Sequence, residues 1–125
     1  MNRSPEAPKS GEGLNAAEAS QLILQSLDED KAEDIVAIDV RGKSSVADML
    51  IVASGRSARH VGALADHLMR KLKEAGAEGM KVEGMPNCDW VLLDAGDVIV
   101  HLFKPEVRAF YNIEKIWTPP AALAS

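Results

Sequence analysis

The sequence predicts a single α/β domain in which a mixed five-stranded sheet is flanked by helices. Two stretches, after Asn15 and after Ser57, have the apolar spacing of amphipathic helices. Short segments rich in β-branched residues lie between and after them, each bounded by Gly, Pro, Ser or charged residues. A chain of 125 residues has room for one modest core. The predicted order is therefore α-β-β-α-β-β-β-α, with one domain over residues 14–117.

The first helix is predicted to begin at Asn15. This residue is a suitable N-cap, and Glu18 completes a capping-box pair three residues later. Residues 1–13 are rich in Pro, Gly, Ser and charge, which predicts a disordered tail. The buried stripe of the helix follows i, i+3, i+4 spacing and consists of Ala19, Leu22, Ile23, Ser26 and Leu27.

Two strands and the longest helix are predicted next. Residues 34–40 and 49–54 read as strands that pair antiparallel through the turn between them. The second, MLIVAS, is apolar on both faces and is therefore placed centrally. Ser57 is the expected N-cap of the long helix, and Gly76 is placed to be its C′ residue. The buried stripe of this helix is Val61, Leu64, Ala65, Leu68 and Leu72.

The remaining strands are predicted at residues 78–85, 89–93 and 98–103, the first of them short and at a sheet edge. Apolar residues fall on both faces of the last two strands, so both faces are expected to be covered. Pro105 suits the start of a final helix, where a missing N–H costs nothing. Residues 118–125 are predicted to be a second disordered tail.

Composition restricts the possible functions. The net charge of −5 argues against direct binding to a nucleic-acid backbone and favours a basic partner. No apolar run approaches the roughly 20 residues that a membrane span needs, and the N-terminus lacks the apolar region of a secretory signal. The single cysteine permits no intrachain disulfide, which fits a cytoplasmic protein. Acidic residues gather between residues 78 and 97, as Glu78, Glu83, Asp89, Asp94 and Asp97.

Two enzymatic readings are weak. The turn at residues 54–57 joins a strand to a helix N-terminus, where an anion can bind, but it has neither a Walker pattern nor GxGxxG. A serine-capped turn explains the same residues. Metal-dependent nucleotidyl transfer needs two carboxylates close together, and the equivalent place has Asp48 followed by Leu50. No enzyme activity is therefore predicted.

No metal or cofactor site is predicted either. His60 and His67 are almost two helical turns apart, too far to share a metal ion. His101 and Cys88 lie on different segments without CxxC or HxxxH spacing. His101 is interpreted as a hydrogen-bonded sheet histidine or as part of a partner surface, and Cys88 as a small semi-buried residue.

The aromatic residues are concentrated in residues 90–117, beside the acidic segment. Phe103, Phe110 and Trp117 are expected to fill the core between the sheet and the final helix. Trp90 and Tyr111 each combine an apolar body with a polar group, and both types are frequent binding hot spots. The sequence therefore indicates a surface for recognising a partner, with these two residues as anchors.

The chain resembles the ribosomal silencing factor family, also called the Iojap family, from about residue 15 to residue 117. Each motif is short, and their order and spacing together are specific. In chain order they are SVAD at 45–48 leading into MLIVASG, Ser57 with His60 and Val61, EG at 83–84, DWVLLD at 89–94, GD at 96–97, VHLF at 100–103, Arg108, and FYNIEKIW at 110–117.

The resemblance implies a fold similar to nucleotidyltransferases without their pair of catalytic carboxylates. It also implies binding to the large ribosomal subunit through its ribosomal protein L-fourteen, a steric block to subunit joining when nutrients are limiting, and a homodimer. Because ribosomal proteins are basic, an acidic aromatic face is complementary to them. The hypothesised contact residues are Trp90, Leu92, Asp94, His101, Tyr111 and Glu114. A role in large-subunit assembly and a divergent nucleotide-binding enzyme are the alternatives.

Overall fold

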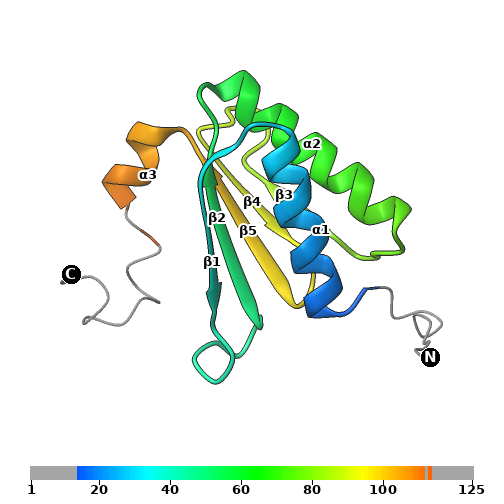
Figure 1. Cartoon of the computed structure of the whole chain (residues 1–125). Coiled ribbons are helices and arrows are strands. Elements are labelled where there is room, and N and C mark those ends of the chain that lie inside the picture. The colour runs from blue at the N-terminus through cyan, green and yellow to red at the C-terminus, as the bar shows by residue number, and fades with distance from the viewer. Residues whose placement is uncertain (1–13, 112, 114–125) are drawn as a thin grey trace.

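The computed structural model describes residues 14–111 and 113, which form a five-stranded sheet with two long helices and one short helix (Figure 1). The predicted tails at residues 1–13 and 118–125 lie outside this range. The elements are α1 (Ala16–Glu29), β1 (Glu33–Asp39), β2 (Met49–Ser54), α2 (Ala58–Glu74), β3 (Lys81–Glu83), β4 (Trp90–Asp94), β5 (Val98–Phe103) and α3 (Pro105–Tyr111). Their order confirms the predicted succession of helices and strands.

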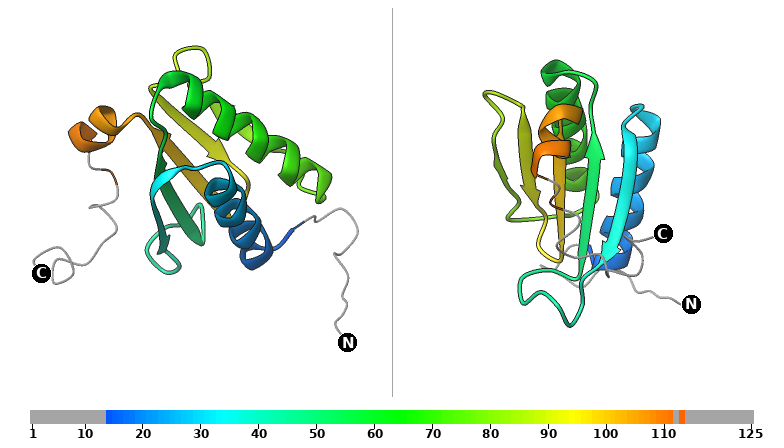
Figure 2. Two further views of the ribbon diagram at one scale, coloured as in Figure 1. Left: turned by 45° about the horizontal axis from the view of Figure 1, so that its top comes forward. Right: turned by 90° about the vertical axis from the view of Figure 1, so that its left-hand side faces the viewer.

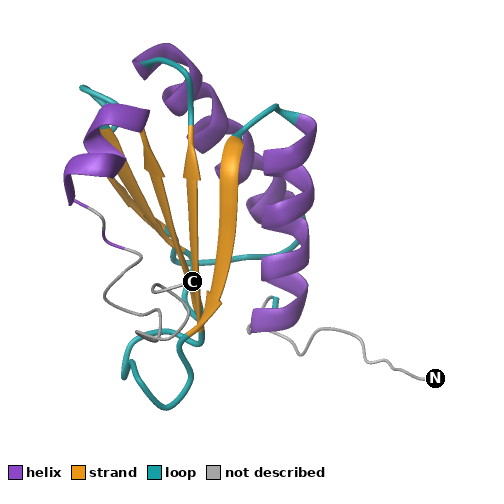
Figure 3. Ribbon diagram, turned by 60° about the vertical axis from the view of Figure 1, so that its left-hand side comes forward, coloured by secondary structure: helices purple, strands orange, loops and turns teal. Residues whose placement is uncertain are grey.

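The sheet has the order β1-β2-β5-β4-β3, and it is mixed as predicted. β2 pairs parallel with β5 at the centre, and every other neighbouring pair is antiparallel. The predicted antiparallel pairing of the first two strands is confirmed. Because β2 and β5 run in the same direction, both deliver the chain to the same edge of the sheet, where α2 and α3 begin (Figure 3).

Both long helices lie on one face of the sheet (Figure 2). Their stripes pack on the inward residues of β2, β4 and β5 to form the larger core cluster, which includes Ile23, Leu27, Ile51, Leu64, Leu68, Leu72, Val91, Leu93, Val100 and Leu102. The predicted caps are confirmed. Asn15 Oδ1 accepts from Glu18 N at 2.8 Å, and Ser57 Oγ accepts from His60 N at 3.1 Å.

The C-terminal end of α1 is fastened to α2 through Asp30. His60 Nε2 lies 2.9 Å from the Asp30 carbonyl oxygen, and His67 Nδ1 lies 2.7 Å from Asp30 Oδ2. His60 Nδ1 also accepts a hydrogen bond from Arg56 N, so the ring carries its proton on Nε2 and donates to Asp30. These contacts, rather than a metal site, account for the two histidines of α2.

The opposite face is covered in part by the described residues. It carries a smaller buried cluster of Val40, Leu50, Val52 and Phe103, and α3 adds Val107 to it. With only seven residues, α3 covers one end of this face, and neither α1 nor α2 contributes to the cluster. We refer to this face as the open face. The predicted edge strand at 78–85 is also shorter than expected, since only Lys81–Glu83 pairs with β4.

Within the described residues, no helix has the length and apolar character needed to cross a membrane.

Candidate partner-binding face

Four of the six hypothesised contact residues lie on the open face. Burial alternates along β4, with Val91 and Leu93 in the helix-side core and Trp90, Leu92 and Asp94 half-buried. Side chains alternate between the two faces of a strand, so these three point away from the helices. Trp90 is paired with Phe103, Leu92 with His101, and Asp94 with Ile99. Tyr111 belongs to α3, but its side chain is outside the description, and Glu114 lies outside the described residues.

The ring of Trp90 is held in place by its neighbours on β5. Its Nε1 donates a hydrogen bond of 2.9 Å to Nδ1 of His101. Its ring centroid lies 5.0 Å from that of Phe103, at an interplanar angle of 31°. His101 and Phe103 are themselves stacked, with centroids 6.0 Å apart. Fixing the indole before a partner arrives lowers the entropy cost of using it in binding.

His101 is buried, with only 5% of it exposed. The prediction of a hydrogen-bonded sheet histidine is confirmed by its bond to Trp90. Since Nδ1 accepts from the indole, the neutral ring carries its proton on Nε2. Burial lowers the pKa of His101 from 6.5 to about 4, so the ring is neutral at physiological pH.

The lowered pKa of His101 makes stability depend on pH in a defined direction. The unfolded chain takes up a proton near pH 6.5, whereas the folded chain resists it until about pH 4. The contribution of neutral His101 to the free energy of unfolding is therefore fully present above pH 6.5 and is lost as pH falls toward 4. We expect the free energy of unfolding to drop by about 2 kcal/mol from this group between pH 7 and pH 5. Urea denaturation at both pH values, compared with His101→Gln, isolates the effect. An equal drop in both proteins would contradict it.

Two hollows flank Trp90 on the open face. One, of about 440 Å³, is lined by Asp89, Trp90, Glu106, Val107 and Phe110, and we call it the α3 hollow. The other, of about 290 Å³, is lined by Glu83, Gly84, Trp90 and Leu92. The indole of Trp90 thus lines both hollows, and each hollow also has acidic residues in its lining. This arrangement matches a protein surface that presents basic side chains.

Phe110 corrects one prediction made from the sequence. It was expected in the core with Phe103, which is fully buried, but Phe110 is 80% exposed. The short helix α3 packs on the sheet through Val107 and the buried Arg108, and this leaves Phe110 at the wall of the α3 hollow. Trp117, the third residue expected in the core, lies outside the described residues.

Lys104 joins the two carboxylates at the rim of the α3 hollow. Its Nζ lies 3.1 Å from Asp89 Oδ1 and 3.5 Å from Glu106 Oε2. The hydrogen bond to Asp89 is the main cause of a raised Lys104 pKa, so this amine stays charged. The main chain closes the same corner, because Lys104 N donates to the Asp89 carbonyl oxygen at 3.0 Å. The sequence predicts Asp89 only as part of an acidic segment. Glu106 and Lys104 are not predicted to join it, because they meet Asp89 only across the β4–β5 pair.

The turn at residues 54–57 uses its polar groups internally. Gly55 N donates to the Phe103 carbonyl oxygen, Arg56 N donates to His60 Nδ1, and Arg108 Nη1 donates to Ser54 Oγ at 2.9 Å. The serine-capped turn predicted from the sequence accounts for these residues, and we assign no anion site here.

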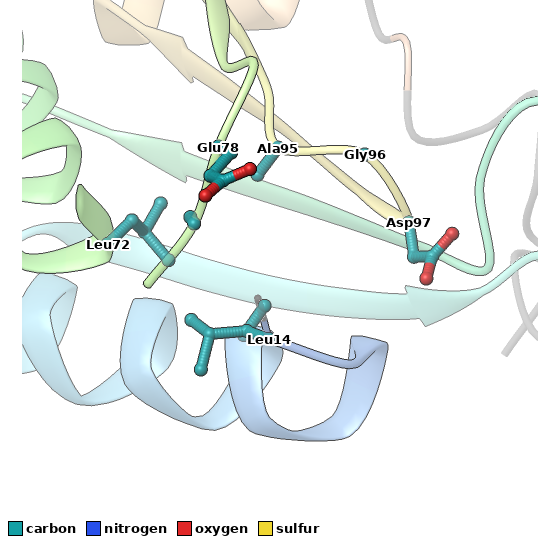
Figure 4. Close-up of a pocket in the computed structure, with 8 residues that line it drawn as sticks. Leu14, Leu72, Glu78, Ala95, Gly96 and Asp97 are labelled. Atoms are coloured by element: carbon teal, nitrogen blue, oxygen red, sulfur yellow. The ribbon is translucent and has the colours of Figure 1, made fainter. Parts of the chain in front are cut away.

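Other candidate sites are small or closed. Cys88 was expected to be semi-buried, but it is buried in the helix-side core. Its Sγ donates to the Met85 carbonyl oxygen, and burial raises the pKa of its thiol. Among residues 14–111 and 113, no group of three potential ligands is arranged to hold a metal ion. Figure 4 shows a pocket of about 130 Å³ between the ends of α1 and α2 and the β4–β5 turn. Its volume is below the roughly 300 Å³ at which small-molecule sites begin.

Comparison with known proteins identifies the family. Residues 14–123 match the family model described as "Ribosomal silencing factor during starvation". A ribosomal silencing factor of Zymomonas mobilis is 54% identical over 97 residues, covering 78% of this chain and 73% of that protein. A crystal structure from Chromobacterium violaceum superposes with a TM-score of 0.81 at 41% identity, covering 86% of this chain and 91% of the other. The mouse protein named "Mitochondrial assembly of ribosomal large subunit protein 1" is 32% identical over 100 residues, covering 78% of this chain and 44% of its own length. The chain, with its single mixed sheet and its open face around Trp90, belongs to the ribosomal silencing factor family.

Proposed function

We propose that this protein represses translation by binding the large ribosomal subunit through its ribosomal protein L-fourteen, where it sterically blocks docking of the small subunit. The repression serves periods of nutrient limitation or stationary growth. Membership of a family named for ribosomal silencing supports this proposal. The observation that carries it is the open face, because a fixed indole lies between two acidic hollows on the side of the sheet that α1 and α2 leave uncovered.

The proposed contacts follow from the geometry of this face. Trp90 is the anchor, Leu92 adds apolar area, and Asp94 faces the partner from the far end of β4. Tyr111 and Glu114 are proposed as further contacts because the family resemblance includes the segment that contains them. His101 acts through Trp90, which it orients. Anchors of this kind dominate interface energies, while the surrounding acids steer a basic partner into place.

The action proposed is that of a non-enzymatic interaction protein in the cytoplasm, which forms a homodimer when it is not bound to the ribosome. Occupancy of the intersubunit face is sufficient to prevent joining, so no catalytic step is required.

A role in large-subunit assembly is the second candidate. It is favoured by the name of the mouse relative, which refers to assembly of the mitochondrial large subunit. One docking surface serves either role. The factor would contact the same ribosomal protein whether it binds a precursor or the mature large subunit.

Sucrose-gradient sedimentation with separated subunits, followed by a subunit-joining assay, tests the proposal. We expect the protein to migrate with the large subunit alone and to reduce the fraction of joined ribosomes as its concentration rises. Migration with the large subunit without any effect on joining would support assembly instead. Failure to migrate with either subunit would overturn the proposal.

A further inference from the structure

We infer that the α3 hollow is a socket for one arginine side chain of the protein partner. This inference rests on the proposed function, since it specifies a contact within the same face. Its walls come from two aromatic residues on different elements, Trp90 of β4 and Phe110 of α3, and Val107 adds an apolar surface. Asp89 and Glu106 supply the carboxylates.

The charge of the hollow selects a cation. Among the described residues, its two carboxylates are bridged by the single amine of Lys104, which leaves a net negative charge on this group. Both acids remain accessible to a partner, because their side chains are 54% and 70% exposed. A phosphate group would meet like charges at this rim, so the hollow favours a basic protein side chain over the nucleic-acid backbone.

The shape of the hollow favours arginine over lysine. A guanidinium group is planar, so it stacks on the faces of aromatic rings while its N–H groups reach carboxylate oxygens at its edge. Trp90 offers such a ring in a fixed orientation, set by its hydrogen bond to His101 and its contact with Phe103. Lys104 contacts Oδ1 of Asp89 and Oε2 of Glu106. The guanidinium group has several N–H donors, so it is suited to bind more than one of the other carboxylate oxygens.

Lys104 is then an internal competitor of the incoming arginine. It draws on the same two carboxylates from within the chain, and it keeps the hollow from carrying two uncompensated charges before the partner binds. Removing its amine is therefore expected to strengthen arginine binding, whereas removing a carboxylate is expected to weaken it. If the cluster had only a structural role, the two kinds of substitution would not change the affinity for arginine in opposite directions.

The first experiment uses N-acetyl-arginine amide as a probe of the isolated protein, with N-acetyl-lysine amide for comparison. The indole N–H signal of Trp90 in a ¹⁵N-labelled protein reports occupancy. We expect the arginine compound to shift this signal with millimolar affinity and the lysine compound to bind several-fold more weakly. Lys104→Met should tighten arginine binding, and Glu106→Gln should weaken it. The matched control is Asp66→Asn, an exposed acid of α2 on the other side of the sheet.

The second experiment measures affinity for purified large subunits. The double variant Asp89→Asn, Glu106→Gln is expected to bind about tenfold more weakly than the natural protein, because each lost charged hydrogen bond costs affinity. Asp66→Asn should change affinity less than twofold. Equal binding of the lysine and arginine compounds, or an unaltered subunit affinity in the double variant, would overturn the socket while leaving the proposed function intact. Absence of subunit binding by the natural protein would overturn the proposed function, and the indole signal would still decide whether the hollow takes arginine.

Discussion

Replacement of Trp90 by alanine is expected to weaken binding to the large subunit by about 100-fold, or about 3 kcal/mol. The indole lines both hollows of the open face, so its loss merges them and removes the surface against which a partner packs. It also leaves Nδ1 of His101 without the donor at 2.9 Å. Binding isotherms with purified large subunits measure the effect.

Two controls separate recognition from folding in this experiment. Trp90→Phe keeps an aromatic wall but lacks the Nε1–H group, so we expect an intermediate loss of about tenfold. Val46→Ala removes an exposed apolar side chain from the β1–β2 loop, at the other end of the sheet from α3, and should bind normally. Native affinity of a folded Trp90→Ala protein would exclude the indole as the anchor.

Replacement of Phe103 by alanine is expected to lower the free energy of unfolding by about 4 kcal/mol. Phe103 is the largest fully buried side chain of the open-face cluster, and it supports both Trp90 and His101. Truncation leaves a cavity that this small cluster, with α3 at only one end, has few atoms to fill. The melting temperature should fall by roughly 20 °C, which circular dichroism measures directly.

The matched variant for this position is Phe103→Leu, which keeps most of the apolar volume and should cost under about 1.5 kcal/mol. If Phe103→Ala lost less than about 1 kcal/mol, the open-face cluster would contribute little to stability, and Trp90 would have to be supported by other contacts.

Most of the fold was predictable from the sequence because its signals are local. The N-caps at Asn15 and Ser57 and the two helical stripes each reside in a few neighbouring residues.

The site could be predicted only in part, because its remaining features depend on long-range packing. Apolar residues on both faces of β5 suggested two covering layers, and among the described residues the second layer is the short helix α3 at one end of the sheet. The exposure of Phe110 depends on how α3 packs on the sheet, which no local sequence pattern reports. The bridge from Lys104 to Asp89 and Glu106 depends on strand register, and no pattern in one stretch of sequence reports it. The burial of His101 likewise depends on the positions of the neighbouring rings of Trp90 and Phe103, which the sequence alone does not give.

The hydrogen bond from Arg108 to Ser54 links the short helix α3 beside the open face to the end of the central strand β2. Ser54 ends β2 and opens the turn into α2, while Arg108 belongs to the short helix that carries Phe110. Arg108 is itself buried, and a buried cation that loses a partner is strongly destabilising. A substitution of Ser54 is therefore expected to affect α3 as well as the turn into α2. Variants that alter the specificity of the open face have to keep this pair, or replace both members with side chains that pack equally well.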